Sequence, residues 1–297
     1  MRSTIVVAVA LAGLTVVGLG AQSLTYSKGQ NVAPAYEGWE RDADGRKYFV
    51  FGYMNRNWLE ELDIEPGPDN GFTPGPADVG QPTHFLPRRN RFVFRVPVPA
   101  GFTEKDELIW TITSHGITEK AWATIREDYL LDDVVKASET GALGAGTSSP
   151  EVRANKAPVV TIAGPKTLTV KVGVPLPLAA VVKDDGVPRR PPIRRGGTPV
   201  PPTRITVGKT NGLHFGWFVF RGKGAVQFSP DQVKSWEDTR AGANSPWAPL
   251  WAPPDLPTDG RLEATATFAE PGTYVLRGLA DDGALTGGEN VTVTVSR

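Results

Sequence analysis

Glycine and proline are the residues that most restrict how this chain can fold. The sequence contains 33 glycines and 27 prolines among 297 residues, about one position in five. Both are costly inside helices, because glycine loses much backbone entropy and proline lacks the amide hydrogen. Apolar residues instead alternate in short runs that end at clusters of Gly, Pro, Asn and Asp. This pattern predicts an all-β protein built as two antiparallel β-sandwich domains in tandem.

The first half of the chain, residues 24–137, predicts an N-terminal β-sandwich domain. The predicted strands cover residues 47–57, 91–99, 107–113 and 117–125, and the last two form a hairpin. Pro97 and Pro99 place the end of one strand at a sheet edge, because proline cannot donate to a neighbouring strand. Residues 65–87 predict a long, turn-rich loop, and loops of that length are either functional or disordered.

The N-terminus, residues 1–23, predicts a secretory signal peptide. Arg2 supplies a positive charge, residues 5–19 are apolar or small, and small residues follow at a cleavage site. The apolar run is too short to span a bilayer comfortably, since about 20 apolar residues are needed. We therefore expect an exported protein, periplasmic or secreted, with no membrane span after cleavage.

The cysteine count and the net charge exclude several classes of function. The chain has no cysteine, so disulfides, thiol catalysis and cysteine-ligated zinc are impossible. Lys and Arg together number 32, and so do Asp and Glu. A nucleic-acid partner is therefore not expected, because such binding relies on an excess of basic residues.

Composition changes in the middle of the chain. Residues 138–156 contain no aromatic residue and are rich in small and polar ones, which predicts a flexible linker. A new series of strands begins after it, so residues 157–297 form the second predicted domain.

The second domain resembles an immunoglobulin-like β-sandwich, closest to the PKD-type (polycystic kidney disease) modules of exported bacterial proteins. Residues 271–283 and 289–295 look like the last two strands of such a module. The resemblance implies a tyrosine corner at Tyr274, a core position at Leu276 and a core tryptophan of the third strand at Trp217. It implies a fold, but the same sandwich hosts many functions.

Two insertions depart from the family pattern and supply a candidate binding surface. Residues 188–212 are rich in arginine and proline, and residues 231–260 hold three of the eight tryptophans. The candidate surface residues are His84, Arg189, Arg190, Arg194, Arg195, Trp236, Trp247 and Trp251. His84 is included because it lies in the long loop, although a lone loop histidine is commonly only a hydrogen-bonding residue.

Two apolar runs each stop at a pair of aspartates followed by glycine, at Asp184 and Asp185 and at Asp281 and Asp282. In an immunoglobulin-like sandwich the second and sixth strands end at the same pole, so the resemblance implies that the pairs converge. One hypothesis is a Ca²⁺ site, because calcium prefers oxygen ligands. Plain turns are the stronger interpretation, because Asp and Gly are common turn residues and no D-x-D-x-D-G run is present. Arg189 and Arg190 could then neutralise the first pair.

The sequence contains no compact catalytic motif. Neither H-E-x-x-H nor G-x-S-x-G occurs, and the three histidines are isolated from one another. The leading hypothesis is a non-catalytic exported binding, adhesion or envelope-associated module that contacts a protein or glycan of the cell envelope. No cofactor is expected apart from the candidate calcium. One alternative is an exported enzyme, for example a glycan-acting one, with its site in the 65–90 loop. Another is an accessory subunit that docks a larger partner through the Trp-rich insertion.

We predict that export removes the first 20 to 23 residues. The order of positive, apolar and small residues in this segment is the reason. Mass spectrometry of the exported protein should find a new N-terminus there. Mature protein that retains Met1 would contradict the signal-peptide interpretation.

Overall fold

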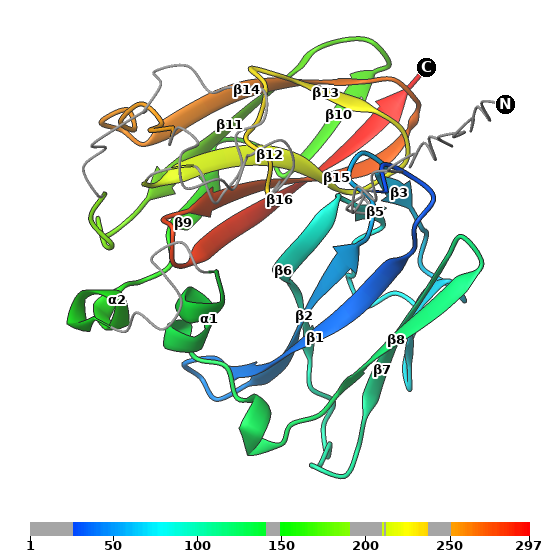
Figure 1. Ribbon diagram of the computed structural model, residues 1–297. Helices are drawn as coiled ribbons and strands as arrows, with labels where there is room; N and C mark the ends of the chain where they lie inside the picture. The colour runs from blue at the N-terminus through cyan, green and yellow to red at the C-terminus, as the bar shows by residue number, and fades with distance from the viewer. Residues whose placement is uncertain (1–25, 141–148, 191–209, 211, 237–250) are drawn as a thin grey trace, which may run out of the picture.

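The computed structural model describes residues 26–140, 149–190, 210, 212–236 and 251–297. The predicted all-β fold is confirmed for these residues, which form several antiparallel sheets and only short helices. Figure 1 shows two β units side by side, with the chain running from the lower unit to the upper one. No helix among these residues is long and apolar enough to cross a membrane. The predicted signal peptide, residues 1–23, lies outside the described residues.

The N-terminal unit contains two three-stranded sheets and one short strand pair. The first sheet has the order β1 (Val32–Arg41), β2 (Lys47–Asn55), β6 (Arg88–Pro97). The second has the order β4 (Asn70–Thr73), β7 (Leu108–Ser114), β8 (Ile117–Ala123). The short pair is β3 (Leu62–Asp63) with β5 (His84–Phe85). The predicted strands at β2, β6, β7 and β8 are confirmed, and β6 is an edge strand, as its prolines required.

The core of this unit is aromatic. Phe51 lies 5.5 Å from Phe94 and 5.7 Å from Trp110 between ring centres, and Phe72 stacks on the same tryptophan. Phe51 and Trp110 have no exposed surface. Such ring pairs add to the stabilisation that comes from burying apolar surface.

Residues 65–87 are an ordered segment rather than a plain loop, because two buried amide side chains hydrogen-bond its backbone. Asn70 donates to the carbonyls of Ile64 and Pro82, each at 2.9 Å. Gln81 donates to the carbonyl of Asn70 at 3.0 Å. Buried carbonyl groups need partners, and here side chains supply them. The short strands β4 and β5 lie inside this segment.

The C-terminal unit is a sandwich of two four-stranded sheets. One has the order β13 (Val226–Ser229), β14 (Arg261–Phe268), β11 (Leu176–Lys183), β9 (Val159–Ile162). The other has the order β10 (Thr167–Lys171), β16 (Thr286–Ser296), β15 (Gly272–Asp281), β12 (His214–Arg221). The chain crosses between the sheets from β11 to β12, from β12 to β13 and from β14 to β15, which is the order of an immunoglobulin-like domain.

The three residues that carried the resemblance occupy the expected places. The Tyr274 hydroxyl donates to the carbonyl of Glu270 at 2.9 Å and also contacts the carbonyl of Lys223, which is a tyrosine corner. Leu276 is fully buried. Trp217 is buried on β12, which takes the place of the third strand of the family's fold. The immunoglobulin-like sandwich is therefore confirmed.

Short helices connect the two units. A 3-10 turn at Glu127–Tyr129 is followed by α1 (Asp133–Thr140) and α2 (Pro150–Ala154). The predicted linker, 138–156, thus contains the end of α1 and all of α2, while 141–148 lie outside the described residues. Ala137 of α1 packs in a small buried cluster with Ala284 and Leu285 of the other unit. The division into separate folding domains stays a prediction.

Side chains of β12 and β15 pack directly into the N-terminal unit. Phe220 is buried in the aromatic core of that unit, and Phe218 and Val275 pack against it. The Arg277 guanidinium lies 3.7 Å from the centre of the Phe220 ring and donates to the backbone carbonyl of Val93 in β6. Burial lowers the pKa of Arg277 to about 10. The units therefore share an apolar interface.

We expect Phe220→Ala to destabilise the N-terminal unit, although Phe220 belongs to the C-terminal one. Removing a buried phenyl ring costs about 3–5 kcal/mol. Amide hydrogen exchange in β2 should accelerate accordingly. The exposed Val174 provides a control, since Val174→Ala should change stability by less than about 0.5 kcal/mol. Unchanged exchange in β2 would mean that the interface does not stabilise the N-terminal unit.

Candidate functional site

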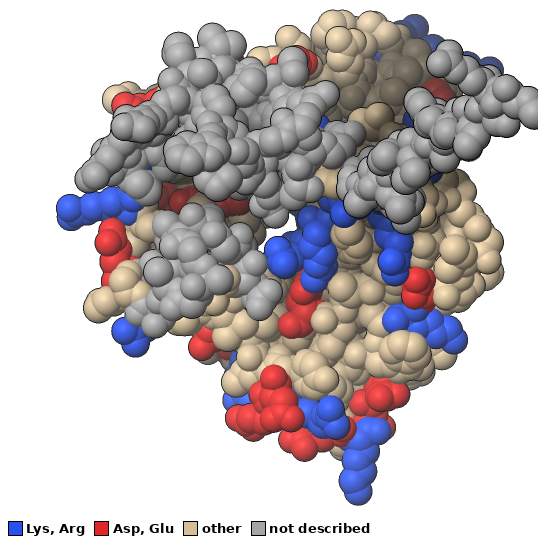
Figure 2. Space-filling model, viewed as in Figure 1, with Lys and Arg blue, Asp and Glu red and all other residues tan. Residues whose placement is uncertain are grey.

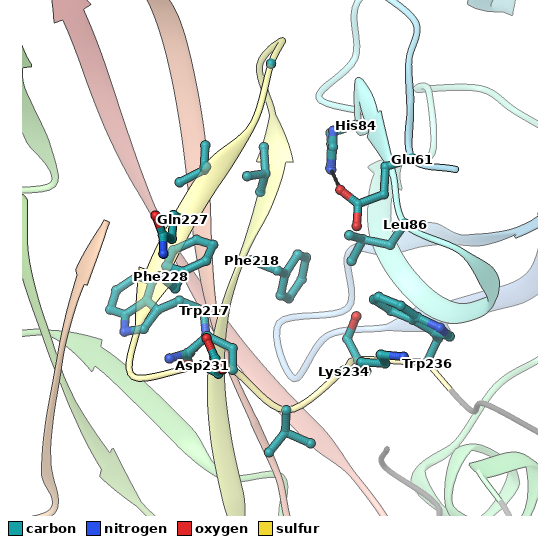
Figure 3. A pocket seen from close by; sticks show the side chains of 16 residues that line it. Glu61, His84, Leu86, Trp217, Phe218, Gln227, Phe228, Asp231, Lys234 and Trp236 are labelled. Atoms are coloured by element: carbon teal, nitrogen blue, oxygen red, sulfur yellow. Dashed lines mark hydrogen bonds and ion pairs between the residues drawn. The ribbon is translucent and has the colours of Figure 1, made fainter. Parts of the chain in front are cut away.

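A pocket with a volume of about 450 Å³ lies where the two units meet. Glu61, His84 and Leu86 of the N-terminal unit form one wall of the pocket (Figure 3). Strands β12 and β13 of the C-terminal unit form the opposite wall, and residues 231–236 run along one side. Its volume is within the usual range for small-molecule sites. We call it the junction pocket.

The side chains of β12 point alternately into the C-terminal sandwich and toward the N-terminal unit, which places this strand in the wall of the junction pocket. Trp217 is buried in the core of the C-terminal sandwich, and the next residue, Phe218, turns toward the N-terminal unit. Successive residues of a strand point to opposite faces, so one strand serves both cores. Because β12 and β13 are each the last strand of their sheet, the pocket lies at an open edge of the sandwich.

The turn after β12 is held against residues 78–84, which fixes the two walls relative to each other. Arg221 forms a two-pronged ion pair with Asp78, with N–O distances of 2.6 and 3.0 Å, and its Nε donates to the carbonyl of Gln81 at 2.7 Å. The Gly222 amide donates to the Thr83 hydroxyl at 3.0 Å, and the Thr83 amide donates to the carbonyl of Phe220 at 3.2 Å. Paired Arg–carboxylate contacts of this kind give a definite orientation.

His84 is a buried histidine between two carboxylates. Its Nδ1 lies 2.7 Å from Asp63 Oδ1 and its Nε2 lies 3.1 Å from Glu61 Oε2. Burial by itself would lower the pKa of His84, but the two carboxylates outweigh it and raise the pKa to about 9. The other oxygen of Asp63 accepts the Gly224 amide at 3.2 Å, so the imidazolium also connects the two walls.

Several polar atoms at the pocket are buried without a hydrogen-bond partner. They are Trp217 Nε1, Ser235 Oγ and Trp236 Nε1. These atoms have almost no accessible surface, as have Asn155 Oδ1 and Asp184 Oδ1 at the aspartate pole, so they do not by themselves mark a site. The junction pocket is the candidate site in the described part of the chain because polar and aromatic side chains of both units meet in it.

The aspartate pairs converge, as the resemblance implied. Asp282 accepts a hydrogen bond from the Asn155 amide group at 3.0 Å, and Asp185 accepts one from the backbone of Lys156 at 3.1 Å. Each aspartate also accepts the backbone amide two residues ahead, at Gly186, Val187, Gly283 and Ala284. They thus act as turn residues.

The environment of the aspartates does not show a ready metal centre. Burial raises the pKa of Asp282 and of Asp184. No group of three or more His, Asp or Glu side chains in the described ranges could hold a metal ion. Arg190, which could have neutralised the first aspartate pair, instead forms an ion pair with Asp255 at 3.4 Å. The calcium site stays a prediction.

Of the five candidate surface residues in the described ranges, two lie at the junction pocket. His84 and Trp236 both line the junction pocket. The Arg189 amide donates to Glu151 at 3.2 Å, and Arg190 donates to the carbonyl of Pro253, also at 3.2 Å. Trp251 is buried elsewhere. Arg194, Arg195 and Trp247 lie outside the described residues.

Other pocket residues were not identified from the sequence. Glu61 belongs to the N-terminal unit, whereas Gln227 in β13 and Asp231 just after it belong to the C-terminal unit. Glu61 stands in a Glu-Glu pair that carries no motif, and neither Gln227 nor Asp231 stands in a recognisable motif. The sequence pointed to this region only through His84 in the 65–90 segment and Trp236 in the Trp-rich insertion.

Comparison with known proteins gives no family. No known sequence family matches the chain, and no curated protein matches it significantly. Among solved structures it is similar to a conjugative transposon lipoprotein from Bacteroides eggerthii (12% identity, TM-score 0.25, 46% of this chain and 95% of that one). It is also similar to the PKD domain of human KIAA0319 (17%, 0.22, 52% and 91%) and to domains 4 and 5 of the S-layer protein SbsC (10%, 0.24, 65% and 66%). At these TM-scores the likenesses carry no argument, and the fold assignment rests on strand order.

We predict that stability falls as the pH rises from about 6.5 to 9, because of His84. A histidine whose pKa is raised on folding contributes its full stabilisation to the folded state below its unfolded pKa, near 6.5. That contribution is lost as the pH rises through the folded pKa. A pKa of about 9 corresponds to a loss of up to about 3 kcal/mol. Urea unfolding at several pH values measures it. His84→Gln should flatten this profile, and an unchanged profile in that variant would contradict the assignment.

Proposed function

We propose that this protein is an exported binding module of the cell envelope, of the PKD-type immunoglobulin-like class, and that it holds its ligand in the junction pocket. Export is supported by the sequence of residues 1–23, and the class by the strand order and by the tyrosine corner at Tyr274. The observation that carries the site is the pocket of about 450 Å³ in which polar and aromatic side chains of both units meet.

Catalysis by His84 is less well supported than binding. A general base needs a free nitrogen within reach of the substrate proton. Both ring nitrogens of His84 are engaged by carboxylates, and the side chain is almost fully buried. An imidazolium held in this way positions its neighbours but has no site from which to take a proton.

Docking of a larger partner through an exposed tryptophan surface is also less well supported. Trp236 and Trp251 are 9% and 6% exposed, so neither presents its ring on the surface. Tryptophans that anchor a partner must be accessible before binding. The burial of Trp236 at the junction pocket instead favours a ligand that enters between the units.

We expect a soluble digest of the native host's envelope to raise the melting temperature of the mature protein. A ligand that binds only the folded state stabilises it in proportion to the logarithm of its excess over Kd. Trp236→Ala should remove the shift, while Trp122→Ala, a half-exposed tryptophan of β8, should retain it. Circular dichroism of both variants verifies that they fold. A digest that leaves the melting temperature unchanged, or a shift that persists in Trp236→Ala, would contradict the proposed site.

A further inference from the structure

We propose that the junction pocket recognises a neutral saccharide, the size of one or two sugar rings, whose hydroxyl groups bond Glu61, Gln227 and Asp231 and whose ring packs on Phe218 and Trp236. This inference rests on the proposed function and names the ligand class of the same site. The inference is based on the way residues from both units come together around the pocket, and not on a sequence motif (Figure 3).

Charged side chains of both signs line the pocket. Glu61 and Asp231 are negative and Lys234 is positive, while protonated His84 lies between the carboxylates of Glu61 and Asp63. A strongly anionic or cationic ligand would meet repulsion as well as attraction at such a surface. The mixture of charges therefore favours an uncharged ligand.

The hydrogen-bonding groups are suited to a polyol. The Oε1 atom of Glu61 has no bonding partner in the described structure, and neither has the side chain of Gln227 or Asp231. Carboxylates accept and an amide both donates and accepts, so together they match groups that do both. A sugar hydroxyl donates one hydrogen bond and accepts others.

Aromatic rings provide an apolar surface beside these polar groups. Phe218, Phe228 and Trp236 surround the middle of the pocket in Figure 3. The C–H face of a sugar ring is apolar and packs on such rings, while its hydroxyl edge reaches polar side chains. Apolar walls with a few placed polar groups are usual in specific small-molecule sites.

A peptide fits this pocket less well, because the edge of β12 is already occupied. Peptides commonly bind at a sheet edge by adding a strand to unpaired backbone groups. Here the Trp217 amide donates to the Gln232 side chain at 2.9 Å, and the Phe220 carbonyl accepts the amide of Thr83 at 3.2 Å. Two of the backbone groups that a peptide strand would need on β12 are therefore already bonded within the chain.

The test measures binding of defined trisaccharides to the mature protein by calorimetry and saturation-transfer NMR. The neutral probes are maltotriose, cellotriose and triacetylchitotriose. The charged probes are deacetylated chitotriose, which is cationic, and trigalacturonate, which is anionic; trialanine represents peptides. We expect at least one neutral probe to bind, and the charged trisaccharides to bind at least about tenfold more weakly, a difference of about 1.4 kcal/mol.

Variants locate the site. Asp231→Asn and Gln227→Ala change exposed side chains and should each weaken binding of the neutral probe about five- to tenfold, through one lost hydrogen bond. Asp44→Asn, at an exposed turn between β1 and β2, is the matched control and should bind as the unchanged protein does. Wild-type affinity in both pocket variants would overturn the proposal, as would equal or stronger binding of a charged trisaccharide.

Two further outcomes separate this inference from the proposed function. If no trisaccharide binds but the envelope digest still stabilises the protein through Trp236, or if trialanine binds instead, the saccharide is overturned and the binding site stands. If neither the digest nor any probe acts, both are overturned.

Discussion

The insertion of Phe220 into the N-terminal core is the interaction on which the remaining arrangement depends. Phe220 lies in strand β12, and Trp217 and Val219 of the same strand are buried in the core of the C-terminal sandwich. Because a strand presents alternate residues to opposite sides, β12 belongs to both units. The immunoglobulin-like sandwich therefore cannot tilt away from the N-terminal unit without exposing a phenyl ring. The junction pocket exists only while that contact is made.

A buried charge reinforces the same junction. An ionised side chain is costly to bury unless it is paired and hydrogen-bonded. His84 meets this requirement because it bonds both Asp63 and Glu61. Asp63 in turn accepts a hydrogen bond from the amide of Gly224, in the turn that follows β12. Glycine at position 222 allows that turn to approach Tyr274, since a Cβ there would collide with the tyrosine ring. The burial of Phe220 and the hydrogen bond from Gly224 to Asp63 thus depend on the same course of the backbone through the end of β12 and the following turn.

Local patterns predicted what depends on local chemistry. Strict alternation identified β2, β6 and the β7–β8 hairpin, and the spacing around Tyr274 identified the sandwich. Strand β1 was missed because Pro34 and Gly38 interrupt its alternation; the structure accommodates them at an edge and at a bulge. The junction pocket could not be predicted, because Glu61, Phe218 and Asp231 meet only through pairing of distant segments. No periodicity within any one segment encodes that meeting.

The difference between the two groups of polar residues argues for where function lies. At the pole of the sandwich, all four aspartates accept backbone amides of their own turns, and Asp185 and Asp282 accept a further bond from residues 155 and 156. Much of their hydrogen-bonding capacity is used by the fold, as expected of turn residues, although Asp184 Oδ1 and Asn155 Oδ1 stay buried without a partner there. At the junction pocket, Gln227 and Asp231 are exposed, and their side chains make no hydrogen bond within the described structure. A ligand can bond such side chains without displacing bonds of the fold, which favours the pocket over the aspartate pole as the place of binding.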